Sequence, residues 1–298
     1  MGVFRKILSS WILLYSLFSI VVIGGAFYLV LDQEIEATVT RQLLDRKRTI
    51  ARAEVVNITT FFEKFGNSVA TLAQLSSIEA SDADAISDLD TFVEQRAKTG
   101  LIEGVVLTDK NGVVRFNSNV LGTRDLGESL ADRDYFAWAK VEGEKGEYFI
   151  SQPVVSQVVV ASPVYQNNAF SGVVASSVKL APLAERFLGL MKISDLTEVY
   201  LVDGSGDLLY SNSADQSLSS IKNVLSATEE GELRSQTHLI AYSPVILGTQ
   251  SWLLIISSPA LEVVNLTRPF YVRQAGVLIL TATTILSLGV IAIRKNYS

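Results

Sequence analysis

The sequence predicts an α+β fold in which a long N-terminal helix runs along two lobes, each built on an antiparallel sheet, with a transmembrane helix at either end. Three observations lead to this prediction. The chain begins and ends with long uncharged runs, the first run is followed by an amphipathic stretch without proline, and one hairpin pattern occurs twice further along. The runs indicate membrane helices, the stretch indicates the long helix, and the repeat indicates two copies of one unit.

The two uncharged runs are long enough to cross a lipid bilayer. Residues 7–31 are 25 residues without a charge, and residues 275–293 are 19. At ~1.5 Å rise per residue, either helix spans a hydrocarbon core of about 30 Å. The first run exceeds the apolar stretch of about 7–15 residues in a cleaved signal peptide, and it ends in Phe27-Tyr28-Leu29 rather than in small residues. We therefore expect an uncleaved anchor and a returning second span.

Basic residues lie at the outer ends of both runs. They are Arg5, Lys6, Arg294 and Lys295. Because positive charge beside a span stays cytoplasmic, we expect residues 1–6 and 294–298 to be cytoplasmic and residues 32–274 to lie across the membrane. The sequence thus predicts a two-pass protein of the plasma (inner) membrane with an extracytoplasmic domain.

The segment between the spans is acidic and contains no cysteine. Its 243 residues suffice for one large domain or two small ones that share a core. It holds all 31 acidic residues and 21 of the 25 basic residues, a formal net charge of −10. This charge argues against nucleic acid or anionic lipid headgroups as partners. Without cysteine, disulfides and thiolate metal sites are excluded.

The first part of this segment predicts a long helix over residues 33–76. It contains no proline and one glycine, and its apolar residues recur at spacings of three, four, seven and eight. The basic cluster Arg46-Lys47-Arg48 is interpreted as a solvated face. The apolar stripe at residues 35–50 has no lobe beside it so near the membrane, so we expect it to pair with a second copy in a homodimer.

A second helix is predicted at residues 83–98, with Ser81 or Asp82 as N-cap. The pattern then changes to hairpins. Residues 104–116 and 199–210 each place a turn with Asp and Gly between two apolar runs, and the two hairpins superimpose at an offset of 94 residues. A Ser-Pro-Val piece recurs in the same order, which indicates two copies of one α+β unit with a smaller helical insert in the later copy.

Four short motifs resemble a known family. They are Asp132-Arg133-Asp134-Tyr135-Phe136, then Gly-Glu-Tyr-Phe-Ile-Ser-Gln-Pro at 146–153, Ser-Pro-Val at 162–164 and Phe-Ser-Gly-Val-Val at 170–174. With the two spans and the long helix, their order and spacing resemble a double Cache sensor domain of bacterial and archaeal transmembrane receptors, over roughly residues 1–293. The resemblance implies PAS-like sheets in a membrane-distal lobe at about 83–190 and a proximal lobe at about 191–262.

The resemblance also implies a ligand site in the distal lobe. Arg133, Tyr135 and Phe136 match the family's Arg-x-Tyr-Phe motif. A guanidinium suits a carboxylate, and Tyr135 offers a hydroxyl beside an apolar ring. In the alternative reading, Arg133 pairs on the surface with Asp132, Asp134 or Glu147, while Tyr135 and Phe136 pack in the core.

The chain departs from the amino-acid-binding branch of the family. That branch has tryptophan and tyrosine where Tyr135 and Phe136 stand, and acidic or tyrosyl residues where this chain has Val154, Ser156 and Ser177. Neutral serines cannot offset a buried ammonium. The expected ligand-binding residues are therefore Arg133, Tyr135, Ser156 and Ser177, and the expected ligand is an organic acid rather than an amino acid, or a neutral polar metabolite.

No cofactor, metal site or catalytic centre is predicted. His238 is the only histidine and is interpreted as structural, and Asp109 and Asp203 open matching turns where their side chains cap backbone amides. Cysteine nucleophiles and phosphate-binding loops are absent from the sequence, and Gly204-Ser205-Gly206 is a hairpin turn rather than a nucleophile elbow.

Two functions remain open at this stage. One is a sensor that binds a small molecule and signals through its spans; the other is a membrane-anchored structural module or co-receptor without a ligand. An open pocket containing Arg133 favours the first, and a pocket plugged by Trp138 and Phe136 favours the second. Because five residues follow the second span, the chain is expected to be the input half of a kinase, cyclase or chemoreceptor, or to signal through a separate cytoplasmic or membrane partner.

Overall fold

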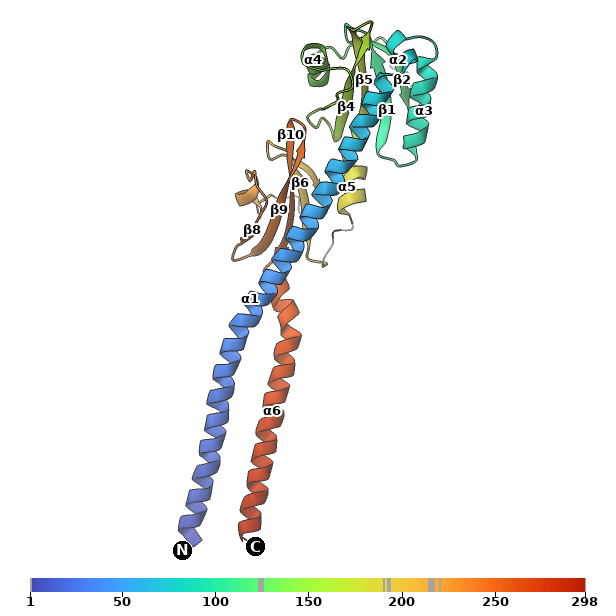
Figure 1. Ribbon diagram of the computed structural model, residues 1–298. Helices are drawn as coiled ribbons and strands as arrows, with labels where there is room; N and C mark the ends of the chain where they lie inside the picture. Colours follow the sequence, from blue (N-terminus) through green and yellow to red (C-terminus); the bar gives the residue numbers. More distant parts are fainter. Residues whose placement is uncertain are drawn as a thin grey trace. The chain divides into compact units, whose positions relative to one another are not determined.

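The computed structural model describes residues 2–122, 126–189, 191, 194–213, 218–219 and 221–297 (Figure 1). Contacts within the chain define two compact units. The helical unit comprises Met1–Asp45, Ser235–Thr237 and Pro259–Ser298, and the lobed unit comprises Arg46–Arg234 and His238–Ser258.

The lobed unit contains two five-stranded antiparallel sheets, which confirms the predicted α+β class. The first sheet has the order β2-β1-β5-β4-β3, from β1 (Ile102–Thr108), β2 (Val114–Asn119), β3 (Phe149–Ile150), β4 (Gln157–Gln166) and β5 (Ala169–Lys179). The second has the order β7-β6-β10-β9-β8, from β6 (Glu198–Val202), β7 (Leu208–Ser211), β8 (Gly231–Arg234), β9 (His238–Leu247) and β10 (Gln250–Pro259). The two orders correspond strand by strand, so the repeat read from the sequence is one unit used twice.

Both predicted hairpins are present, and their aspartates act as expected. Asp109 Oδ1 accepts hydrogen bonds from the amides of Asn111 at 2.9 Å and Val113 at 3.1 Å. Asp203 Oδ1 accepts from the amides of Ser205 and Asp207, both at 2.9 Å. The insert is also smaller in the later copy, where the 3-10 helix η1 (Lys222–Val224) stands in place of α4 (Asp134–Val141).

The helices differ from the sequence prediction in three details. Helix α1 (Gly2–Ala73) is continuous, so the predicted helices 7–31 and 33–76 are one helix that ends three residues early. Short α2 (Ser76–Ala80) was not predicted. Helix α3 (Ala85–Ala97) confirms the second helix, but its N-cap is Asp84 rather than Ser81 or Asp82. Asp84 makes no side-chain capping bond, and Asp82 Oδ1 accepts from the Asp84 amide at 2.9 Å.

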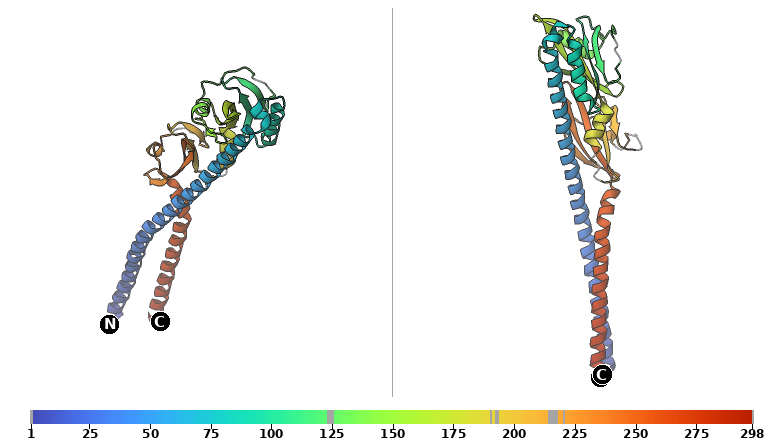
Figure 2. Two further views of the ribbon diagram at one scale, coloured as in Figure 1. Left: turned by 45° about the horizontal axis from the view of Figure 1, so that its top comes forward. Right: turned by 90° about the vertical axis from the view of Figure 1, so that its right-hand side faces the viewer.

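Within the lobed unit, α1 packs against both sheets and forms one core with them (Figures 1 and 2). The ring of Phe62 packs edge-to-face against that of Trp252 in β10, with centroids 5.5 Å apart. The ring centroids of Phe65 and Phe92 of α3 are 6.1 Å apart. Helix α5 (Leu180–Leu188), which links the two sheets in the chain, buries its apolar residues in the same core. The two lobes therefore share their hydrophobic centre.

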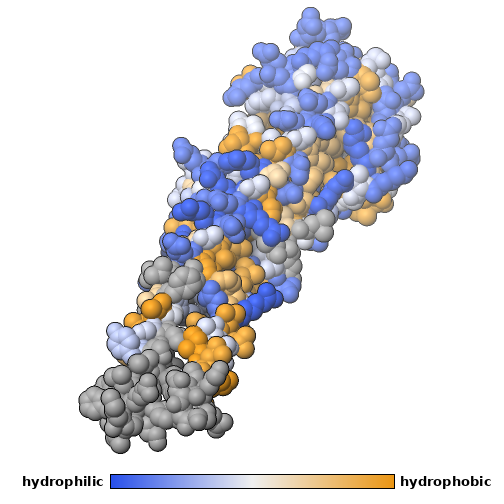
Figure 3. All heavy atoms as spheres, turned by 60° about the horizontal axis from the view of Figure 1, so that its bottom comes forward, coloured by the Kyte–Doolittle hydropathy of each residue, from blue (hydrophilic) through white to orange (hydrophobic). Residues whose placement is uncertain are grey.

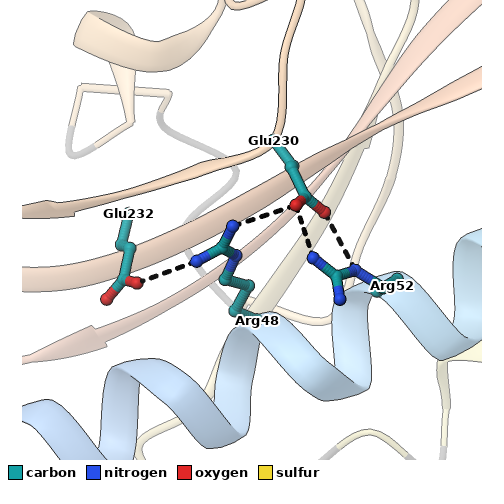
Figure 4. Close-up of polar contacts among 4 residues, drawn as sticks. All are labelled: Arg48, Arg52, Glu230 and Glu232. Atoms are coloured by element: carbon teal, nitrogen blue, oxygen red, sulfur yellow. Dashed lines mark hydrogen bonds and ion pairs between the residues drawn. The ribbon is translucent and has the colours of Figure 1, made fainter.

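The basic cluster at 46–48 is not simply a solvated face, and for Lys47 that interpretation is wrong. Lys47 is fully buried, and its side-chain nitrogen donates to Ser258 Oγ at 2.7 Å. Arg48 and Arg52 both reach Glu230, and Arg48 also reaches Glu232 at 3.5 Å (Figure 4). Only Arg46 is exposed. The cluster thus attaches α1 to the second lobe.

The helical unit contains a candidate membrane span. Within helix α6 (Leu261–Tyr297), the segment Leu261–Ile291 is long and apolar enough to cross a bilayer. The most apolar 18 residues of this segment are not buried. Exposed hydrophobic side chains are visible in orange in Figure 3. The ring of Tyr28 on α1 lies 5.8 Å from that of Tyr271 on α6. Most side chains of the predicted span at 7–31 lie outside the described residues.

The apolar stripe used to predict a homodimer is partly covered within one chain. Leu43 is buried, and Ile35 and Val39 are half-buried. The premise that nothing lies beside the whole stripe is therefore wrong at Leu43.

Candidate functional site

The first sheet divides its side chains between two faces with a period of two. Val158 and Val160 of β4, with Val174 and Val178 of β5, enter the core shared with α1. The intervening residues point to the opposite face, as strand geometry requires. Helix α4 packs on that face, where Tyr135, Phe136 and Ala139 form a small cluster with Ala161, Val173 and Ala175. This second face carries the candidate site.

Helix α4 places the predicted motif at its first turn. Arg133 is the N-cap in an extended conformation, and its carbonyl accepts from the amides of Phe136 at 3.1 Å and Ala137 at 3.0 Å. Phe136 packs edge-on against Phe170, and Trp138 stacks on Phe149 with centroids 5.2 Å apart. Phe136 and Trp138 therefore pack beside the site and do not plug it.

Two adjoining cavities open between α4 and the sheet. The larger, of about 360 Å³, is named here the Glu103 cavity, and the other, of about 300 Å³, the Arg133 cavity. They share the lining residues Leu130, Tyr135, Gln157 and Val159. Gly104 lines the larger one, and a Cβ there would lie 2.5 Å from the Ser118 carbonyl oxygen, so glycine is needed where β1 approaches β2.

Arg133 lines the smaller cavity, and its side chain makes few contacts with charged groups of the protein. Its side chain is 47% exposed, and among the described residues its one ion pair is with Asp132 Oδ1 at 4.0 Å. Asp134 is engaged instead by backbone, accepting from the amides of Tyr135 at 2.7 Å and Gln152 at 3.2 Å. Glu147 accepts from the Glu144 amide at 3.1 Å. The surface pairing considered as an alternative is therefore limited to one long contact.

Tyr135 lines both cavities and keeps its hydroxyl protonated at neutral pH. Burial of the phenol raises the pKa of Tyr135 to about 12, against the opposing charge of Arg133. Among the described residues, no hydrogen-bond partner is found for its hydroxyl. A buried tyrosine hydroxyl usually finds a partner, so the cavity offers a ligand both a donor and an acceptor at this point.

Sequence reasoning missed an acidic residue in the site. Glu103 of β1 lines the larger cavity together with Asn117 and Asn119 of β2, and its carboxylate accepts a hydrogen bond from Gln157 Nε2. The signal available was a charged residue inside an otherwise apolar strand. The argument from Val154, Ser156 and Ser177 that no acidic group faces the ligand thus does not hold for this cavity.

The structure places the other residues singled out from the sequence differently with respect to the two cavities. Ser177 of β5 lines the larger cavity with Tyr135. Val154 lines the smaller one. Ser156 does not line either cavity; it lies on an exposed turn between Val154 and Gln157. The structure therefore brings Arg133, Tyr135 and Ser177 to one pair of cavities and leaves the Ser156 side chain outside.

The second lobe fills the corresponding face with its own side chains. Tyr200 of β6 stands 94 residues after Val106, at the equivalent position in the repeat. It is buried against Ile221, Val224 and Ile240, and its hydroxyl donates to Glu198 Oε2 at 2.8 Å. The larger side chain of Tyr200, with its hydroxyl hydrogen-bonded, thus stands in the second lobe where Val106 stands in the first.

Residues 32–267 match the Cache domain family, so the chain belongs to it as a double Cache sensor domain. This match covers most of the chain and indicates a sensor rather than a catalytic family. No curated protein matches the sequence closely. Among the described residues, no group of three or more His, Cys, Asp and Glu side chains is placed to hold a metal ion.

Solved structures with the same fold include ligand-binding domains of receptors. The domain of the Pseudomonas aeruginosa PAO1 amino acid chemoreceptor PctB, in complex with L-Arg, is 18% identical with a TM-score of 0.55, covering 74% of this chain and 96% of that one. The sensory domain of the Campylobacter jejuni chemoreceptor Tlp3, with isoleucine bound, is 14% identical with a TM-score of 0.55, covering 77% and 97%.

A third similar structure is longer than this chain. The extracellular ligand binding receptor from Desulfohalobium retbaense DSM5692 is 14% identical with a TM-score of 0.57, and the match covers 70% of this chain but 39% of that one. At these identities the likeness establishes the double Cache fold.

Proposed function

We propose that this protein is a membrane-anchored extracytoplasmic sensor that binds a small polar metabolite in the first lobe and signals through two transmembrane helices. The observation that carries the proposal is the pair of open cavities beside α4. They bring the exposed guanidinium of Arg133 close to the Tyr135 hydroxyl, for which the described part of the chain supplies no hydrogen-bond partner. The sensor therefore has stronger support than a ligand-free structural module.

The favoured ligand is an organic acid with a hydrogen-bond donor. Its carboxylate would lie on Arg133, whose planar fork of donors suits a two-oxygen acceptor. At the other end, Glu103 already accepts from Gln157, and its remaining lone pairs suit a hydroxyl. A hydroxy acid satisfies both ends without burying an ammonium.

An amino acid is the second candidate, and Glu103 is the observation that favours it. A carboxylate in the cavity offsets the desolvation of an ammonium, which serines cannot do. PctB and Tlp3 were both solved with amino acids. The two candidates differ in one functional group, so matched ligands separate them.

The test is a thermal-shift comparison on the full chain in detergent micelles. L-Lactate is compared with L-alanine, and L-malate with L-aspartate, since each pair differs only in hydroxyl against ammonium. A ligand at 100 times its Kd stabilises the folded state by about 2.7 kcal/mol. We expect the hydroxy acids to give the larger shifts. Larger shifts with the amino acids that disappear in Glu103→Gln would establish the second candidate, and no shift in a wider screen of polar metabolites would refute the sensor.

The proposed topology has both termini in the cytoplasm of a two-pass inner-membrane protein. It is supported by the exposed apolar surface of α6 and by the contact of Tyr28 with Tyr271, because tyrosines gather at the membrane–water interface. Signalling through the spans needs a cytoplasmic module, in the same polypeptide or in a partner.

We also propose that two copies pair in the membrane. Half-buried Val39 on α1 is the position to test, since buried Leu43 is less accessible. Val39→Cys is expected to form an intermolecular disulfide under mild oxidation, in a chain that has no other cysteine. Monomer alone, with Glu36→Cys and Val56→Cys equally unreactive, would contradict pairing through this part of α1.

A further inference from the structure

An unusual turn borders the Arg133 cavity. Val154 and Gln157 exchange two backbone hydrogen bonds, of 2.8 and 3.0 Å, around a two-residue loop. Both loop residues have positive φ, 46° at Val155 and 65° at Ser156. Turns of this kind prefer Asn-Gly, and a β-branched residue is strongly disfavoured in the left-handed region. Residues 154–157 are called the 154–157 turn below.

The strain in this turn is not offset by packing. Val155 is 90% exposed as a residue, so it gains almost no buried contact in return for its backbone conformation. Strained residues that persist in a fold gather at ligand clamps and switches. An element held in a poor conformation lies close in free energy to its alternatives, and a small bias is enough to shift it.

The turn contacts the cavity on one side and α5 on the other. Val154, Val155 and Gln157 all line the Arg133 cavity. On the other side, the Ser156 carbonyl accepts a hydrogen bond of 2.9 Å from the amide of Leu180, the first residue of α5. A rearrangement of the turn that moves the Ser156 carbonyl must break that bond or move the start of α5.

Helix α5 continues the path into the second lobe. Leu180, Leu183 and Leu188 are buried in the core that also contains Trp252 and Leu254 of β10. On its exposed side, Glu185 accepts a hydrogen bond from the Tyr210 hydroxyl of β7 at 3.3 Å. Because a close-packed core shifts as a unit rather than deforming continuously, a displacement of α5 reaches the second sheet.

We propose that the 154–157 turn is the moving element that couples the cavity to the second lobe: filling the cavity reshapes the turn, and the Ser156–Leu180 hydrogen bond carries the change into α5. The inference rests on the proposed function, because it requires a ligand beside Arg133. In this role Ser156 contributes its backbone carbonyl rather than its hydroxyl.

The chain supplies a matched control for the test. Strand β4 has a second two-residue turn at its other end, where Asn167 and Asn168 have φ of 54° and 61° and Gln166 pairs with Ala169. The test variant is Val155→Asn with Ser156→Gly. It places in the 154–157 turn the two residue types that prefer the positive φ found there. The control is Asn168→Gly, which improves the far turn of the same strand.

Hydrogen exchange on the full chain in detergent micelles, without any ligand, gives the answer. We expect the test variant to slow amide exchange about fivefold in its own turn, in Leu180–Leu188 and in Leu208–Ser211, whereas the control slows exchange only around residues 166–169. A test variant that leaves α5 and β7 unchanged, or a control that slows them equally, overturns the coupling. Since no ligand is used, this result is independent of the thermal-shift test of the proposed function.

Discussion

Replacing Arg133 with alanine should remove ligand binding while leaving the fold intact. Its side chain is 47% exposed and approaches one acidic atom at 4.0 Å, so little native contact is lost. Its N-cap role is carried by its backbone carbonyl, which the substitution keeps. We expect the unliganded free energy of unfolding to change by no more than about 0.5 kcal/mol, as for other surface substitutions.

The expected loss of affinity follows from the hydrogen bonds that Arg133 would make. A hydrogen bond to a charged group contributes about 1.5–3 kcal/mol, or about ten- to a hundredfold in Kd. A ligand at 100 times its original Kd stabilises the wild type by about 2.7 kcal/mol, and a hundredfold loss reduces this to about 0.4 kcal/mol. Thermal unfolding with and without each hit of the organic acid and amino acid screen measures the difference.

Two further variants make the test decisive. Arg133→Lys should recover part of the shift, because a single ammonium cannot reproduce the planar fork. Arg115→Ala is the control, since Arg115 is 59% exposed, belongs to the same lobe and pairs with Asp109 outside both cavities. The reasoning is refuted if Arg133→Ala lowers the unliganded melting temperature sharply and leaves the ligand-induced shift intact, because the arginine would then be structural.

Three other predictions test the topology and the attachment of α1. In intact cells, Ser298→Cys should resist a membrane-impermeant maleimide while Asn168→Cys reacts, and labelling at position 298 would reverse the assignment. Lys47→Ala should destabilise the protein by about 2–5 kcal/mol, because removing the buried side chain leaves a cavity. Arg46→Ala, on the exposed face, should change the free energy of unfolding by about 0.5 kcal/mol or less. Equal effects of the two variants in chemical unfolding would contradict the buried contact. The side-chain hydrogen bonds from Arg52 and Arg48 lower the pKa of Glu230 from 4.5 to about 2. The contribution of Glu230 to stability should therefore be complete above pH 4.5 and disappear as the pH falls to about 2. Glu230→Gln should abolish this pH dependence of stability at low salt, and an unchanged pH profile would refute the prediction.

Most of the fold was readable from local patterns. The period of the apolar residues predicted α3 and the part of α1 outside the membrane span, and the recurring hairpin predicted two copies of one unit. The matching strand orders of the two sheets are a finding of the structure. The continuity of α1 was missed because a change from membrane to water is a change of composition, not of helix geometry, and charged residues such as Glu34 and Glu36 favour a helix as well as leucine does. Lys47 was missed because its long side chain lies in the core and meets Ser258, 211 residues away.

Three of the predicted residues, Arg133, Tyr135 and Ser177, line the cavities. Arg133 and Tyr135 lie in one turn of α4, so a motif could point to them. Glu103 reaches the larger cavity from β1, where a register shift between Ile102 and Val105 interrupts the alternation that would have marked its face. Ser156 has a left-handed backbone in the 154–157 turn, and its side chain does not line either cavity.

The alternation of side chains along β4 and β5 has a consequence for how such a receptor changes over time. Even-numbered positions, such as Val158 and Val174, are buried in the core that includes α1. Odd-numbered positions, such as Val159 and Ser177, face the cavities. Substitutions at partly exposed cavity-facing positions such as Ser177, unlike buried odd positions such as Ala161 and Val173, can therefore alter the chemical preference of the receptor at little risk to its stability, so descendants of one scaffold can come to respond to different compounds.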